Sequence, residues 1–182
     1  MFNLSTQNVV PSIEKTPINR KGPFVYQHYH NFFTNIQDLM VDIDGNQFEI
    51  LEKQEKYPRK KLRYDNTQSK RLKVFFMDKN ITQALQEKFS TSLKFSSVDY
   101  WSDQAGYFLP SHVDHDSIKL SLQIYIGEDH PGTVLFDNNT VVHTFKFENN
   151  SGYAMLSNNK TFHGLEYPVK RNNRFSIYVR YQ

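Results

Sequence analysis

Residues 111–125, SHVDHDSIKLSLQIY, join a loop rich in metal-binding side chains directly to an alternating apolar strand. On an extended backbone, residues i and i+2 point to the same side, so His112 and Asp114 are expected to present an imidazole and a carboxylate together. Such a pair is the arrangement that a metal ion needs from two adjacent ligands. Roughly 0.4 pairs with this spacing are expected by chance in a chain of this histidine and aspartate content, so the pair alone does not establish a site.

The composition is that of a globular protein. Hydrophobic residues make up 38% of the 182 residues and aromatic residues 15%, which is too many for a disordered chain. No stretch approaches the length of apolar sequence that a membrane-spanning helix needs, and the N-terminus lacks the pattern of a secretory signal. The sequence has no cysteine, which excludes disulfides and thiolate metal ligands. We therefore expect a single soluble, cytoplasmic domain spanning residues 1–182.

Residues 1–92 are predicted to support a β-rich second half. Residues 8–24 contain three prolines and little periodicity, so they are expected to form an irregular arm. A helix is well supported where apolar residues recur every four positions over 81–89, after a capping Asp78 or Asn80. The other predicted elements are a helix over 34–43, a turn over 44–47, a strand over 47–53 and a short buried strand over 72–77.

From residue 93 onward the sequence changes to short segments rich in β-branched and aromatic residues. Several of these segments alternate, and turns such as GEDHPG, DNN and NNSG separate them. The predicted strands are 93–101, 119–126, 140–147, 152–156 and 174–181. Many short strands at nearly regular spacing argue for a sandwich, a barrel or a jelly roll. The predicted class is α+β but mainly β, with a β-core over 93–182 and supporting N-terminal helices.

A site of two histidines and one carboxylate leaves coordination positions open, which suits non-haem Fe(II) that must also bind substrate and oxygen. Three later histidines are candidates for the second imidazole. His130 lies in a turn, where a ligand would be poorly fixed, and His143 lies in a strand, where a half-buried histidine usually serves packing. His163 lies near the start of a strand after a polar turn, and Arg174 follows eleven residues later. This favours His163, with His143 as its main rival.

Alternation within RFSIYVRY, residues 174–181, places Arg174, Ser176 and Tyr178 on one face of the strand and three apolar residues on the other. A guanidinium beside a hydroxyl on an otherwise buried face needs an anionic partner. A carboxylate fits the guanidinium fork with two hydrogen bonds. The sequence therefore predicts a carboxylate-binding group in addition to the metal ligands.

The ordered set HVD, His163 and RFS resembles the Fe(II)- and 2-oxoglutarate-dependent dioxygenases, most closely their prolyl-hydroxylase-like branch. The resemblance spans about residues 98–182, and YWSDQAGYFLPSHVD contains the tyrosine and the Gly-aromatic pair that precede His-x-Asp in that branch. Gly132-Thr133 matches a Gly-Thr turn of the family, and GPFVYQHYHNFFT, residues 22–34, resembles the opening of these proteins. The segment ENNSGYAMLS, residues 148–157, lacks the proline that the family has before its distal histidine.

The resemblance implies a double-stranded β-helix, which is a cupin-like jelly roll, and an enzyme that uses Fe(II), 2-oxoglutarate and O2. The residues it assigns are the iron ligands His112, Asp114 and His163 and the cosubstrate-binding residues Arg174, Tyr125, Ser176 and Tyr100. Tyr100 matches less securely, because its spacing to His112 is two residues longer than usual. Since Asp114 is present, where halogenating relatives have a small residue, hydroxylation is favoured. The resemblance implies release of succinate and CO2, with a small molecule or a peptide or protein side chain as substrate.

A basic segment gives the chain a second possible partner. Residues 53–73 hold nine lysines and arginines against two acidic residues, within a chain whose net charge is only +3. A solvated loop is the simpler interpretation, but the segment could attract an anionic substrate or nucleic acid. Nucleic-acid demethylation by the same chemistry is therefore an alternative, although Tyr57 and Tyr64 are the segment's only aromatic residues for stacking. A jelly-roll binding module without turnover is another. The sequence leaves the substrate and the oligomeric state open.

Overall fold

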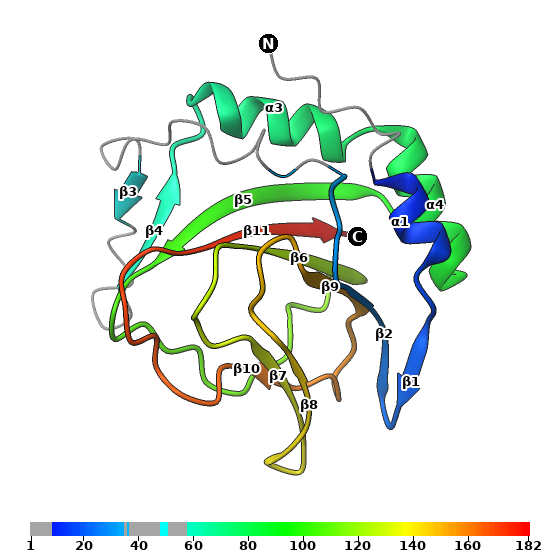
Figure 1. The fold of residues 1–182 in the computed structure, drawn as a ribbon. Coiled ribbons are helices and arrows are strands. Elements are labelled where there is room, and N and C mark those ends of the chain that lie inside the picture. Colours follow the sequence, from blue (N-terminus) through cyan, green and yellow to red (C-terminus); the bar gives the residue numbers. More distant parts are fainter. Residues whose placement is uncertain (1–8, 35, 37–47, 51–57) are drawn as a thin grey trace.

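The structure, a computed structural model, describes residues 9–34, 36, 48–50 and 58–182 (Figure 1). Its helices are α1 (Val10–Lys15), α3 (Thr67–Phe76) and α4 (Lys79–Phe89). Its strands are β1 (Asn19–Lys21), β2 (Phe24–Tyr29), β3 (Phe48–Ile50), β4 (Arg59–Leu62), β5 (Phe95–Asp103), β6 (Leu120–Ile126), β7 (Thr133–Asp137), β8 (Thr140–Phe145), β9 (Gly152–Leu156), β10 (His163–Gly164) and β11 (Arg174–Tyr181).

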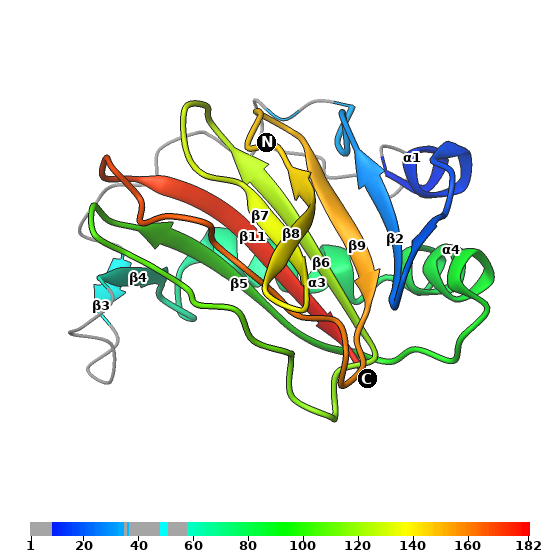
Figure 2. The same ribbon diagram turned by 90° about the horizontal axis from the view of Figure 1, so that it is seen from below.

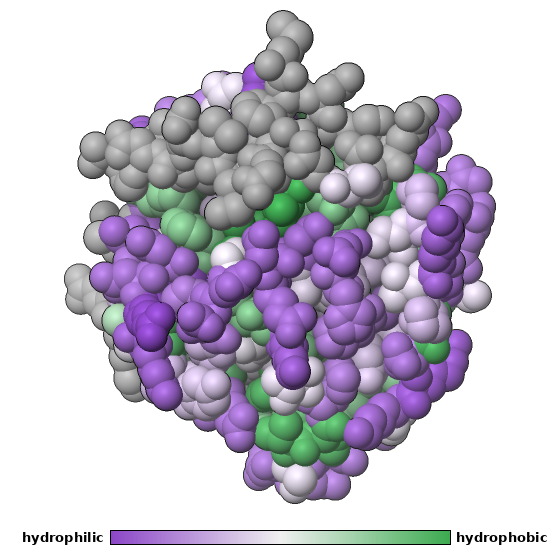
Figure 3. Space-filling model, viewed as in Figure 1, coloured by the Kyte–Doolittle hydropathy of each residue, from purple (hydrophilic) through white to green (hydrophobic). Residues whose placement is uncertain are grey.

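The strands form two antiparallel sheets. The large sheet has eight strands in the order β1-β2-β9-β6-β11-β5-β4-β3, and the small sheet has three in the order β10-β7-β8. The helices cover one face of the large sheet, and the small sheet lies against its other face (Figures 1 and 2). This mainly β, two-sheet architecture is the jelly roll with supporting helices that was predicted. Where Figure 3 colours the surface, hydrophilic residues predominate, and smaller apolar patches lie between them.

Alternation along the central strands separates an apolar face from a polar one. On β11, Ile177 and Val179 are fully buried in the main core, which also contains apolar residues of α3 and α4. Complete burial of such a side chain contributes about 1.5–3 kcal/mol. The alternate residues of β11 and β6 point toward the small sheet, and among them are Arg174, Ser121 and Gln123. The candidate site lies on this polar inner face.

The helix predicted over 81–89 is confirmed as α4. The carboxylate of Asp78 caps its first turn, where it accepts a hydrogen bond from the backbone nitrogen of Asn80 at 2.7 Å. The apolar residues of the predicted repeat, Ile81, Leu85 and Phe89, are all buried. The helix ends at Ser90, whose φ of 52° turns the chain away.

The strand predicted over 72–77 is wrong, because this segment belongs to helix α3. Its buried residues, Leu72, Phe75 and Phe76, follow the i, i+3, i+4 spacing of a helix face, although in the sequence they look like a continuous apolar run. The side chain of Asn66 caps the helix by accepting from the backbone nitrogen of Gln68 at 2.7 Å. The irregular arm predicted over 8–24 is also corrected, since it contains α1 and β1.

The five strands predicted after residue 93 correspond to β5, β6, β8, β9 and β11, whereas β7 and β10 were not predicted. In the N-terminal part, the strand predicted over 47–53 is seen as β3 within the described residues. The helix predicted over 34–43 lies outside the described residues apart from positions 34 and 36, and the turn over 44–47 lies wholly outside them. None of the helices in the described part of the chain is both long and apolar enough to span a membrane.

Candidate metal centre

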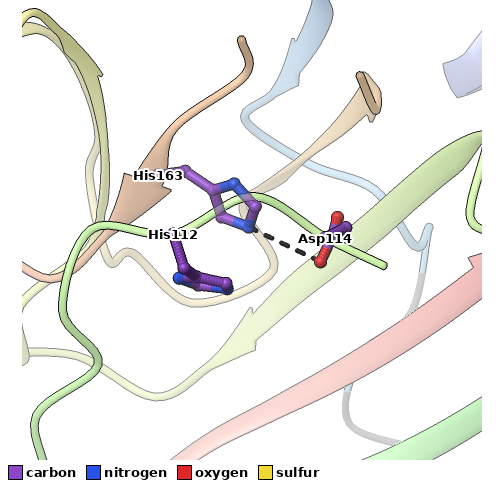
Figure 4. Close-up of side chains that lie close together, drawn as sticks. All are labelled: His112, Asp114 and His163. Atoms are coloured by element: carbon purple, nitrogen blue, oxygen red, sulfur yellow. Dashed lines mark ion pairs between the residues drawn. The ribbon is translucent and has the colours of Figure 1, made fainter. Parts of the chain in front are cut away.

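The structure brings His112, Asp114 and His163 together at one end of the inner face (Figure 4). His112 lies in the loop before β6 and His163 begins β10, and a single antiparallel bridge joins their backbones. In that bridge, His112 N donates to His163 O at 3.0 Å and His163 N donates to His112 O at 2.8 Å. One ligand atom from each of the three side chains lies within 4.8 Å of the others, and no other such group of three occurs among the described residues.

Both imidazoles are oriented by backbone carbonyls. His112 Nδ1 lies 3.0 Å from Pro110 O, and His163 Nδ1 lies 3.0 Å from Thr161 O. Because a carbonyl oxygen only accepts, each Nδ1 carries a proton, and in the neutral ring the lone pair then lies on Nε2. This second hydrogen bond is the usual way in which a metal-binding histidine is fixed. Two neutral imidazoles and one carboxylate are the donor set that suits non-haem Fe(II), so these residues fit that ion.

Three hydroxyl groups hold the carboxylate of Asp114. Ser121 Oγ donates to Oδ2 at 2.6 Å, Ser157 Oγ donates to the same oxygen at 3.1 Å, and Tyr178 Oη donates to Oδ1 at 2.8 Å. Burial works to raise the pKa of Asp114, but facing His163 and these hydroxyl groups lower it, and the net pKa lies below its ordinary value. The carboxylate is therefore charged and fixed near neutral pH.

The pKa of His163 is lowered, chiefly because the ring is buried; the neighbouring Asp114 opposes this shift and His112 adds to it. His163 Nε2 lies 3.8 Å from Asp114 Oδ1. Near pH 7 this contact joins a neutral ring to a carboxylate, and it is not an ion pair. A neutral His163 is the protonation state that metal binding requires.

The three residues line a cavity of about 160 Å³. Its walls include the aromatic residues Trp101 and Tyr107 and, as its cationic groups, Arg59 and Arg174. One cavity therefore joins a candidate metal centre to guanidinium groups that can bind an anion.

Arg174 begins β11 and its side chain is 98% buried. Its Nη1 donates to Asp103 Oδ2 at 2.6 Å, and its Nε donates to Pro131 O at 2.8 Å. The guanidinium carbon lies 4.9 Å from the ring centroid of Phe147 and 5.5 Å from that of Tyr125. The anionic partner expected for this arginine is thus supplied in part by the protein, through Asp103, which sequence reasoning did not identify.

Arg59 approaches the same carboxylate from β4. Its Nε donates to Asp103 Oδ1 at 2.5 Å and its Nη2 to Oδ2 at 3.3 Å. The guanidinium carbon lies 4.5 Å from the ring centroid of Trp101 and 4.3 Å from that of Tyr107. Burial works to lower the pKa of Arg59, but Asp103 and the neighbouring phenols raise it above its ordinary value, so the group is charged.

Of the remaining residues predicted to bind the cosubstrate, two are hydrogen-bonded to residues that line the cavity and one is not. The Tyr125 hydroxyl is buried beside the cavity and accepts a hydrogen bond from Thr133 N at 3.0 Å. Ser176 Oγ accepts from Gln123 Nε2 at 3.2 Å. Tyr100 is not brought to the cavity: it faces the helices, in the main core, with its ring centroid 5.9 Å from that of Phe175.

Gln123 and Tyr153 are two of the cavity residues that sequence reasoning missed, although a signal for Gln123 was present. Gln123 Oε1 accepts from Tyr153 Oη and from Thr133 Oγ1, each at 3.1 Å. In β6, LSLQIYI, Ser121 and Gln123 alternate with apolar residues, a pattern that marks a buried strand with one polar face. Tyr153 gave no such signal, because a tyrosine in a strand is usually part of a core.

The other candidate ligands and the basic segment lie elsewhere. His143 packs in β8 against the rings of Tyr26 and Phe145, and His130 packs against a phenylalanine, so neither joins the triad. In the basic segment, Arg59 is turned inward, and so is Lys61, whose Nζ lies 3.7 Å from the carboxylate of Asp99. These two cations belong to buried ion pairs and not to a solvated loop.

Comparison with known proteins adds a likeness in fold. No family model and no curated protein matches the sequence. Among solved structures, a prolyl 4-hydroxylase from Phytophthora capsici matches all of this chain and 66% of its own, with a TM-score of 0.65 and 14% identity. A Trichoplax adhaerens prolyl hydroxylase, solved with a peptide fragment of hypoxia inducible factor, matches 96% of this chain and 87% of its own, with a TM-score of 0.61 and 13% identity.

Two bacterial structures are similar to this chain as well. The match with a prolyl-4-hydroxylase from Pseudomonas putida covers 96% of each chain, with a TM-score of 0.59 and 12% identity. A protein of the 2OG-Fe(II) oxygenase family from Burkholderia pseudomallei matches 95% of this chain and 75% of its own, with a TM-score of 0.53 and 13% identity. The chain therefore shares the fold of 2OG-Fe(II) oxygenases and prolyl hydroxylases, and it carries a His-Asp-His triad within that fold.

Proposed function

We propose that this protein is a non-haem Fe(II)- and 2-oxoglutarate-dependent oxygenase that hydroxylates a small molecule or a peptide or protein side chain, releasing succinate and CO2. One observation carries the proposal: a single cavity contains both a fixed His-Asp-His triad and a buried arginine. The first suits Fe(II), and the second suits a carboxylate. The shared fold with prolyl hydroxylases supports the same chemistry.

In this proposal, His112, Asp114 and His163 hold the iron, and Arg174 binds the distal carboxylate of 2-oxoglutarate. Bound iron supplies the activation of dioxygen that oxidation of a C–H bond needs. The protein's own contribution is to keep the His163 imidazole neutral through burial, to keep the Asp114 carboxylate charged, to orient His112 through the carbonyl of Pro110, and to exclude water with the cavity's aromatic walls.

Two hydroxyl groups are proposed to assist Arg174. The Tyr125 hydroxyl accepts from Thr133 N, and Ser176 Oγ accepts from Gln123 Nε2. Because each oxygen already accepts a hydrogen bond, its own proton is available for donation to an anion. Tyr100 is left out of the proposed site, because its ring lies on the opposite face of the sheet.

The substrate class rests on a comparison with one relative. The Trichoplax prolyl hydroxylase was solved with a peptide, which supports a peptide side chain as one class of substrate for this chain. The inward pairing of Arg59 and Lys61 weakens the case for nucleic acid, since these two cations are not available on the surface.

The test is release of labelled CO2 from 2-oxoglutarate labelled at C1. Protein loaded anaerobically with Fe(II) and then exposed to oxygen should release the label slowly even without a substrate. Asp114→Ala should abolish release, whereas Asp116→Ala, which removes an exposed carboxylate two residues away, should leave it unchanged. The proposal fails if the wild-type protein releases no label and binds neither Fe(II) nor 2-oxoglutarate. A screen of candidate substrates, measured as stimulated succinate formation, would then identify the substrate.

A further inference from the structure

The register of the large sheet places three charged residues in a row across three adjacent strands. Asp103 on β5 is paired directly with Arg59 on β4 and with Arg174 on β11. All three side chains point to the inner face, and the carboxylate of Asp103 is completely buried between the two guanidinium groups. Both arginines line the cavity that contains the triad.

This cluster has one more positive charge than negative. Two guanidinium groups share one carboxylate, so one charge is uncompensated in a region that excludes most water. Tyr107 does not supply the missing anion near pH 7, because burial raises its pKa to about 12. The other carboxylate of the cavity, Asp114, is held by three hydroxyl groups at the proposed metal centre, where its charge would offset that of the ion. A buried charge without a partner is costly, so the cluster favours an anionic ligand.

Arg174 alone would not create this preference. Paired with Asp103 at 2.6 Å, it forms a neutral unit, and a carboxylate added to that unit would be the uncompensated group. Arg59 makes the cluster cationic. Its guanidinium packs against the rings of Trp101 and Tyr107, so its position is fixed by packing as well as by charge.

We propose that Arg59 is a second determinant of cosubstrate binding, in which it supplies the positive charge that balances the distal carboxylate of 2-oxoglutarate. Asp103 is the positioning residue that holds Arg59 and Arg174 side by side. The inference rests on the proposed function. It predicts selectivity for 2-oxo acids with a second carboxylate, because only these neutralise the cluster.

The test compares two ligands that differ only at the far end. 2-Oxoglutarate and 2-oxopentanoate share the 2-oxo acid group, but the second lacks the distal carboxylate. Their affinities are measured by calorimetry on protein saturated with Mn(II), so no turnover is needed. The wild-type protein should bind 2-oxoglutarate more tightly. Arg59→Met should weaken 2-oxoglutarate binding on the order of a hundredfold and leave 2-oxopentanoate binding within about threefold of the wild type.

A double variant separates charge from structural damage. In Arg59→Met/Asp103→Asn, Arg174 becomes the single charge of the cluster, so binding of 2-oxoglutarate should recover to within about tenfold of the wild type. Lys60→Met is the matched control, because it removes a cation from the adjacent position of β4, whose side chain points to the opposite face of the sheet. It should change neither affinity.

Each result has a distinct meaning. Equal weakening of both ligands in Arg59→Met, or no recovery in the double variant, would overturn the role of Arg59. So would an Arg59→Met variant that keeps the wild-type preference for 2-oxoglutarate. If the wild-type protein itself does not bind 2-oxoglutarate, the proposed function fails, and this inference fails with it.

Discussion

Removal of the Tyr178 hydroxyl tests whether this group orients Asp114, one of the three proposed metal ligands. Tyr178→Phe keeps the ring but takes away the 2.8 Å hydrogen bond to Asp114 Oδ1. A hydrogen bond to a charged group contributes about 1.5–3 kcal/mol, which corresponds to roughly 10- to 150-fold in affinity. Ser121 and Ser157 still hold the other carboxylate oxygen, so the loss should lie near the lower end. We expect Mn(II) affinity to fall about 10- to 30-fold, within the range typical for groups that orient metal ligands.

The assay is a Mn(II) titration followed by the electron paramagnetic resonance signal of the free ion. Tyr181→Phe is the matched control: it removes a hydroxyl from the same strand, where Tyr181 Oη donates to Phe76 O at 3.3 Å in the main core. The control should bind Mn(II) as the wild type does. An unchanged affinity in Tyr178→Phe, or an equal loss in both variants, would refute the view that this hydroxyl orients Asp114.

Three further outcomes are expected. Because burial lowers the pKa of His163, protonation of this ring should weaken Mn(II) binding only below the ordinary histidine pKa of about 6.5, in a titration of affinity against pH. Gly152→Ala should cost about 3 kcal/mol or more in a urea unfolding experiment, because a Cβ there would lie 2.0 Å from a carbonyl oxygen of β6. Gly22→Ala, with a φ of +58° and open space around it, should cost only about 1–2 kcal/mol. Burial and two neighbouring histidines lower the pKa of His28 to about 4, so between pH 6.5 and about 4 the unfolded chain binds more protons than the folded one. The free energy of unfolding should therefore fall as the pH decreases through this range. His28→Gln should flatten that dependence.

The three residues of the triad could be predicted because each stands in a recognisable segment of the sequence. The spacing of His112 and Asp114 needs only the geometry of an extended backbone, and His163 was favoured by the kind of segment in which it lies. The structure brings the three together. The polar face of β11 was likewise readable from alternation, and Arg174 lies on the inner face as expected.

The ion pairs behind the site could not be predicted from the sequence. Asp103 lies 44 residues from Arg59 and 71 from Arg174, and only the order and register of the strands place them together. The assignment of Tyr100 shows the same limit. Since neighbouring strand residues face opposite sides, one position decides whether a side chain lies in the core or at the cavity, and here Trp101 lines the cavity instead.

Helix α3 illustrates a different limit. The run LKVFFM contains enough apolar and β-branched residues to suit a short buried strand, and its helical spacing is evident only when Leu72 is considered together with Phe75 and Phe76. Helix and strand are hard to separate for such short apolar runs. The cap at Asn66, six residues upstream, was the available signal for a helix.

The backbone bridge between His112 and His163 implies that the chain need not wait for a metal ion to complete its fold. The two reciprocal hydrogen bonds set the separation of the histidines from main-chain atoms alone. A chelator should therefore strip the ion and leave the protein folded, and added Fe(II) should restore it without refolding. Under the proposed function, the supply of iron would then set how many of the already folded molecules are active at a given moment.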